Sequence, residues 1–110
     1  EKPYAHRTWQ SADGLTLHYR DYPGPADAAE KPPILCLHGL TRNARDFAPL
    51  ADHLCKSWRV IVPEMRGRGR SDYAPDSSTY SPAHYVGDVE ALLSDRGIEQ
   101  FIAIGTSMGG

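Results

Sequence analysis

Three short apolar runs, separated by amphipathic stretches, constrain the fold of this chain more than any other feature. The runs are residues 34–37, residues 59–63, in which Arg59 precedes four apolar residues, and residues 101–104. Each run is strand-sized and apolar at consecutive positions, which is typical of strands buried on both faces of a parallel sheet. Because helix-like stretches lie between the runs, the pattern predicts an α/β protein with a mostly parallel sheet and helices on its faces.

Two of the intervening stretches have the spacing of amphipathic helices. Asn43, with Asp46 three residues later, is expected to cap the first helix, and His53 falls off its apolar stripe. Ser81-Pro82 is expected to open the second, and Gly97 to end it. The apolar stripe of the first helix consists of Phe47, Leu50, Ala51, Leu54 and Cys55, and that of the second of Tyr85, Val86, Val89, Leu92 and Leu93.

The N-terminal part of the chain predicts an antiparallel hairpin before the parallel strands. Residues 4–10 have strand composition, Asp13-Gly14 is a strong turn signal, and residues 15–20 alternate between apolar and polar. This alternation describes a strand with one wet face, so we expect His18, like His6, to face solvent. Residues 22–33 predict a proline-rich surface connection.

Composition argues against several function classes. With 12 Lys and Arg against 14 Asp and Glu, the net charge is −2, which gives no general attraction to nucleic acid or to an anionic membrane. The apolar runs are too short to span a membrane, and no Cys/His cluster indicates a metal site. We expect Cys36 and Cys55 to be reduced core thiols in a cytoplasmic protein, with a disulfide or a metal pair as the alternative.

Residues 64–72 interleave arginines with glycines directly after the second apolar run. An RNA-binding or phosphate-binding loop is one interpretation. The segment is short, lacks aromatic residues for base stacking, and is flanked by Glu64 and Asp72, which disfavours that interpretation. We favour a tight turn at a strand end, in which glycines supply unusual backbone angles and the arginines pair locally.

After the last apolar run, Gly105-Thr106-Ser107-Met108-Gly109 has the G-x-S-x-G pattern of a nucleophile elbow. In such an elbow the serine has a strained, positive φ on a strand-to-helix turn, and glycines two positions away avoid collisions. A nucleotide-binding interpretation is disfavoured, because the segment is not G-x-G-x-x-G and lacks the lysine of a P-loop.

Three blocks in this order resemble the N-terminal part of the α/β-hydrolase superfamily: residues 37–40 (Leu-His-Gly-Leu), residues 63–72 and residues 105–110. The resemblance implies that residues 1–110 are the N-terminal part of one α/β-hydrolase domain and end at the elbow. The rest of the domain would be a separate chain or a missing continuation. The middle block carries Glu64 where the family usually has Asp, and we interpret this block as structural.

The resemblance also implies roles for individual residues. Ser107 would be the nucleophile, and the backbone N–H groups of Leu40 and Met108 would form the oxyanion hole. His38 would brace the oxyanion loop, supported by Gly39, Gly105 and Gly109. The catalytic acid and histidine would follow Ser107 in the missing part. All the histidines of this chain precede the serine and are therefore not expected to be the base: His6, His18, His38, His53 and His84.

The sequence thus predicts the front part of a serine hydrolase that cleaves an ester, lactone or similar acyl bond of a small molecule. It predicts no cofactor and no metal, and it predicts that residues 1–110 alone are inactive. Members of the same family that hydrolyse carbon–carbon bonds, transfer acyl groups or act as cofactor-free haloperoxidases remain alternatives. So does a non-catalytic protein that binds a small ligand. An acid and a histidine beyond Gly110 would separate the enzymes from the binding protein.

Overall fold

Five strands form one mixed sheet in the part of the chain that the computed structural model describes, residues 3–38 and 47–105. The strands are β1 (Ala5–Gln10), β2 (Thr16–Tyr22), β3 (Ile34–Leu37), β4 (Val60–Pro63) and β5 (Ile102–Gly105), in the spatial order β1-β2-β4-β3-β5. The β1 and β2 strands form an antiparallel hairpin, β2 pairs antiparallel with β4, and β3 runs parallel to both β4 and β5. The expected fold class is confirmed.

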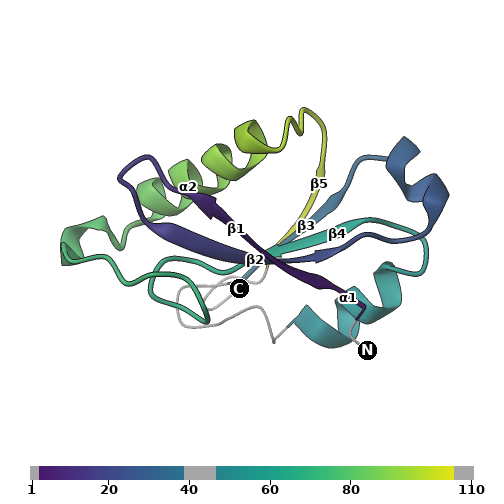
Figure 1. The fold of residues 1–110 in the computed structure, drawn as a ribbon, viewed down its shortest axis with the longest axis horizontal. Coiled ribbons are helices and arrows are strands. Elements are labelled where there is room, and N and C mark those ends of the chain that lie inside the picture. Colours follow the sequence, from purple (N-terminus) through teal and green to yellow (C-terminus); the bar gives the residue numbers. More distant parts are fainter. Residues whose placement is uncertain (1–2, 39–46, 106–110) are drawn as a thin grey trace.

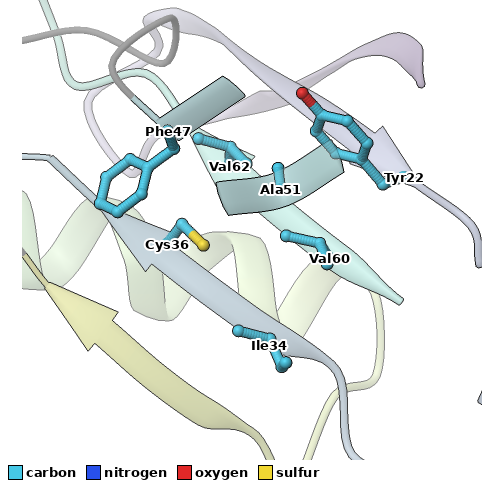
Figure 2. Close-up of a cluster of buried hydrophobic side chains, with 7 residues drawn as sticks. All are labelled: Tyr22, Ile34, Cys36, Phe47, Ala51, Val60 and Val62. Atoms are coloured by element: carbon cyan, nitrogen blue, oxygen red, sulfur yellow. The ribbon is translucent and has the colours of Figure 1, made fainter. Parts of the chain in front are cut away.

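Two helices cover opposite faces of this sheet (Figure 1): α1 (Ala48–Leu54) and α2 (Pro82–Asp95). Successive side chains of a strand point to opposite faces, which is why the consecutive apolar residues of β3 and β4 supply two cores. Figure 2 shows the core on the α1 side, where Phe47 and Ala51 meet side chains of β2, β3 and β4. On the other face, Leu35 and Ile61 pack in one cluster with Leu92 of α2.

Both cysteines are unpaired thiols, as predicted. Cys36 of β3 is fully buried in the core of Figure 2, and this burial raises the pKa of its thiol to about 11. Cys55 is half-buried just after α1, where desolvation also raises the pKa of its thiol. Neither thiol is therefore a good nucleophile near neutral pH.

The ends of α2 follow the sequence prediction closely. The Ser81 hydroxyl accepts a hydrogen bond from the His84 N–H (3.2 Å), Pro82 is the first helical residue, and Gly97 has a φ of +65° just beyond the helix. The α1 helix begins at Ala48 with Phe47 as its N-cap. The expected cap, Asn43, lies outside the described residues.

The predicted apolar stripes are wrong at two positions. Leu50 is 38% exposed and Val86 is 59% exposed. Val86 lies about 120° around the helix from the buried Leu92, outside the face that meets the sheet. Asp88 occupies that buried face instead. His53 and His84 are exposed, as expected.

Two short 3-10 helices interrupt segments for which the sequence predicted only irregular structure. One, Ala26–Glu30, lies in the proline-rich connection, and the other, Ser77–Thr79, lies in the polar loop before α2. The Asp76 carboxylate accepts a hydrogen bond from the Ser78 N–H and so caps the second. No helix among the described residues combines the length and the apolar character that crossing a membrane requires.

Candidate active site

Three parallel strands bring the predicted site segments together at the end of the sheet where their carboxyl termini lie. His38 directly follows β3, Glu64 directly follows β4, and Gly105 ends β5. Leu37 and Gly105 are partners in the register of β3 and β5, so the chain leaves both strands side by side. Open α/β sheets bind their ligands at this end, outside the carboxyl termini of the strands.

Only part of the predicted site falls within the described residues. His38 and Gly105 do, whereas Gly39, Leu40, Ser107, Met108 and Gly109 lie outside them. The positive φ of Ser107 and the direction of the two oxyanion N–H groups therefore remain predictions. Among the described residues, a Cβ at position 105 would meet only the carbonyl oxygen of Leu37, at an ordinary 3.8 Å. These neighbours do not by themselves require glycine at position 105.

His38 is tied to the segment that follows β4. Its ring is buried, and its Nε2 accepts a hydrogen bond from the backbone N–H of Met65 at 3.1 Å. Nε2 must be unprotonated to accept this bond. The residue that precedes Gly39 and Leu40 in the sequence is therefore held at a fixed place, which supports the bracing role predicted for it.

His18 is buried, which corrects the expectation that it faces solvent. Its Nδ1 lies 2.6 Å from the Glu64 carboxylate, and its Nε2 lies 2.8 Å from Nδ1 of the exposed His6. The alternation of β2 predicted one wet face, but β2 is an inner strand between β1 and β4, and His6 of β1 and Glu64 just after β4 both contact the His18 ring. A buried imidazole is tolerated there because both ring nitrogens are hydrogen-bonded.

Ser71 joins the segment after β4 to β2. Its Oγ accepts a hydrogen bond from the His18 N–H (2.8 Å) and donates one to the carbonyl oxygen of Glu64 (2.6 Å). The Glu64 carboxylate also accepts from the Arg70 N–H at 3.0 Å. Glu64 is thus held by its backbone and by its side chain, which supports the interpretation of this block as structural.

Arg66 does not pair locally, which corrects, for this residue, the expectation stated for the arginines of residues 64–72. Its guanidinium is almost fully buried and forms a bidentate ion pair with Asp88 of α2 (2.6 and 2.8 Å). It also binds Asp13 in the β1–β2 turn (2.9 and 3.1 Å). This pairing explains why a carboxylate occupies the buried face of α2.

The hydrogen bond from Arg66 lowers the pKa of Asp13 to about 2, with Ser11 contributing a further bond. A carboxyl whose pKa is lower in the folded state stabilises the fold above its ordinary pKa. That contribution is lost as the pH falls toward 2. At neutral pH the ion pair between Asp13 and Arg66 therefore holds the β1–β2 turn against the segment after β4.

The sequence did not predict the roles of three buried polar residues in this hydrogen-bonded region: His18, Ser71 and Asp88. Each is buried with a polar partner more than 20 positions away in the sequence. The one available signal was the placement of Glu64 and Ser71 within the motif-like block after β4. Among the described residues, no group of three His, Cys, Asp or Glu side chains has the arrangement of a metal site.

Comparisons with known proteins agree with this geometry. The sequence model of the alpha/beta hydrolase fold family matches residues 32–110. A curated protein of Cupriavidus necator, named 3-hydroxybutyrate-oligomer hydrolase, is 40% identical over 94 residues, which are 86% of this chain and 32% of that protein.

Solved structures show the same likeness. An alpha/beta hydrolase from Novosphingobium aromaticivorans superposes with a TM-score of 0.91 at 57% identity, over 96% of this chain and 36% of that one. An epoxide hydrolase from Vigna radiata superposes with a TM-score of 0.81 at 25% identity, over 96% of this chain and 32% of that one. The chain thus spans about a third of the length of these proteins.

Proposed function

The chain belongs to the α/β hydrolase family, and from that membership we propose that it is the front part of a serine hydrolase whose nucleophile is Ser107. One observation carries the proposal. Gly105 of the G-x-S-x-G pattern ends β5 and pairs with Leu37, the residue before His38, so the serine segment and the His38 segment leave the sheet side by side. A nucleophile and an oxyanion-binding loop need this adjacency.

We propose an acyl bond, in an ester or lactone, as the bond that is cleaved. The Ser107 hydroxyl adds to the acyl carbon, and the alcohol leaves, so that an acyl-enzyme forms on Ser107. Water then hydrolyses that ester and restores the hydroxyl. The N–H groups of Leu40 and Met108 stabilise the oxyanion in both steps. The acid and the histidine that move the protons belong to the part of the domain beyond Gly110.

The chemistry of serine argues against epoxides, although several relatives are named epoxide hydrolases. A serine oxygen that opened an epoxide would form an alkyl ether, which water does not cleave under mild conditions, so the enzyme would stop after one turnover. An acyl-enzyme, by contrast, is an ester and turns over. A serine at position 107 therefore favours acyl substrates.

Within the acyl substrates, we propose short oligoesters of hydroxy acids as the class to test first. The name of the Cupriavidus necator relative supports this choice. We also propose a cytoplasmic location, which the unpaired thiols of Cys36 and Cys55 support.

The test is a substrate panel on the full-length protein that contains this chain. We expect turnover of a 3-hydroxybutyrate dimer or a p-nitrophenyl ester, and no turnover of styrene oxide. Ser107→Ala should lower kcat by about 10⁴-fold or more without changing the thermal midpoint by more than a few degrees. His84→Ala, at an exposed residue of α2, is the matched control and should keep full activity.

Two outcomes would contradict the proposal. Turnover of the epoxide but not of any ester would reject the acyl mechanism. Saturable binding of esters without turnover by the wild-type protein would instead support the non-catalytic, ligand-binding alternative.

A further inference from the structure

A continuous line of hydrogen bonds runs from β2 to His38 through the hydroxyl group of Ser71. The His18 N–H donates to Ser71 Oγ (2.8 Å), and Ser71 Oγ–H donates to the carbonyl oxygen of Glu64 (2.6 Å). The peptide group that carries this carbonyl also carries the N–H of Met65, which donates to His38 Nε2 (3.1 Å). The side chains of Ser71 and His38 therefore hydrogen-bond to the C=O and the N–H of the same peptide group, between Glu64 and Met65.

The direction of every bond in this line is fixed. Ser71 has one hydroxyl hydrogen, and because its oxygen accepts from a backbone N–H, that hydrogen is the one given to Glu64. The peptide group is planar, so holding its carbonyl oxygen also sets the direction of the Met65 N–H. Bonds aligned in this way polarise and strengthen one another.

All the participating side chains are shielded from water. Ser71, His38, Glu64 and Met65 are each 4–5% exposed. The Glu64 carboxylate adds a second fastening, because it accepts from the Arg70 N–H next to Ser71 and binds the His18 ring. Water cannot replace the Ser71 hydroxyl without a cavity to hold it.

We propose that Ser71 is a positioning residue for the oxyanion-binding segment, and this proposal rests on the proposed function. In this role Ser71 contacts neither the substrate nor the nucleophile. It orients the Glu64–Met65 peptide group, which holds the His38 ring, and His38 precedes Gly39 and Leu40 in the sequence. Loss of the hydroxyl should displace the donor of the oxyanion hole and slow the chemical step, while substrate binding is retained.

Three variants of the full-length protein test this proposal. Ser71→Ala removes the hydroxyl, and Ser71→Cys keeps similar volume but offers only a weak donor and acceptor. Ser57→Ala, at an exposed serine between α1 and β4, is the matched control. If Ser71→Ala does not fold, Ser71→Cys carries the test.

Steady-state kinetics with a p-nitrophenyl ester give the first readout. We expect Ser71→Ala to lower kcat by about 10- to 100-fold with KM changed less than about twofold, because misplaced catalytic groups cost rate rather than binding. Ser71→Cys should fall between Ser71→Ala and the wild type. Ser57→Ala should be unchanged.

Nuclear magnetic resonance of the backbone amide of Met65 and the imidazole nitrogens of His38 gives the second readout, independent of any activity. In the wild type, His38 Nε2 should have the nitrogen shift of an unprotonated acceptor. In Ser71→Ala, the Met65 amide proton should exchange at least about tenfold faster. The amide of Leu92, which lies within α2 and takes no part in this line, should keep its protection.

The two readouts separate this proposal from the proposed function. A folded Ser71→Ala or Ser71→Cys variant with unchanged Met65 exchange, or with unchanged kcat, would overturn the positioning role. If the Met65 and His38 signals respond as expected but the wild type turns over no ester, the hydrogen-bonded line stands and the proposed function is wrong.

Discussion

Glu64 and Gly69 compete for the same space in the turn after β4. Gly69 has a φ of +52°, and a Cβ at this position would overlap the Glu64 carboxylate. Glycine is thus required twice, for the backbone angle and for the room that lets the carboxylate reach His18 and the Arg70 N–H. Within this arginine–glycine segment, Gly69 therefore leaves room for the buried Glu64 carboxylate.

Gly69→Ala should consequently be more harmful than an ordinary glycine substitution. Left-handed backbone costs about 1–2 kcal/mol for an alanine, and displacing a buried charge-assisted hydrogen bond adds about 1.5–3 kcal/mol. Gly97→Ala is the matched control, because Gly97 has a φ of +65° and no heavy atom near its Cβ position. Urea unfolding of the full-length variants measures the difference. Equal losses for both would contradict the role assigned to the Glu64 carboxylate.

At the scale of elements, the buried Arg66 joins three parts of the fold. It connects the segment after β4 to Asp88 of α2 and to Asp13 in the β1–β2 turn. The same helix is also held by the Trp9 indole N–H, which donates to the Asp88 carbonyl oxygen at 2.8 Å. α2 is therefore fixed to its face of the sheet by polar contacts as well as by Leu92.

Arg66→Met should destabilise the protein by about 3–5 kcal/mol, because it leaves the buried Asp88 carboxylate without its cation. Adding Asp88→Leu should recover part of that loss, since an apolar pair needs no countercharge. Thermal and urea unfolding give the free energies of unfolding of these two variants and of Asp88→Leu alone, which complete a double-mutant cycle. A single variant that loses less than about 1 kcal/mol, or a double variant no better than the single, would contradict this account of the ion pair.

The elements themselves were largely predictable, because their signals are local. The continuous apolar runs became β3, β4 and β5, and Ser81-Pro82 and Gly97 mark the ends of α2. The buried polar residues were not predictable. His18 and Asp88 occupy positions that the periodicity assigns to water and to apolar contacts, and their partners come from distant parts of the chain.

The candidate site was predictable as a set of motifs but not as a network. The sequence places His38 and Gly105 at strand ends, and the structure brings those ends together. The partner of His38 is a backbone N–H, which carries no signature in the sequence. The roles of Ser107, Leu40 and Met108 remain predictions.

At the scale of the whole molecule, β5 is the exposed edge of the described sheet. It pairs only with β3, and Phe101 and Ile102 are each 42% exposed. We expect β5 to gain a second neighbouring strand and a covering helix in the full-length protein. An uncovered apolar edge of this kind invites pairing with another chain.

Residues 1–110 expressed alone should therefore fail to form a stable, active monomer. Each large side chain left uncovered forgoes about 1.5–3 kcal/mol of burial, and a whole domain is stable by only about 5–15 kcal/mol. Sedimentation and thermal unfolding should show self-association or the absence of a cooperative transition. A cooperatively folding monomer that hydrolyses an ester in a Ser107-dependent way would refute this expectation and the placement of the base beyond Gly110.

The assignment of Ser107 as the nucleophile is tested most directly by trapping its covalent adduct. The full-length protein is treated with a fluorophosphonate, and separately with a slowly hydrolysed ester at low pH, and the modified peptide is identified by mass spectrometry. We predict one adduct, on Ser107, at full occupancy, and none in Ser107→Ala. Modification at any other residue, or an unmodified Ser107 in a protein that hydrolyses esters, would contradict it.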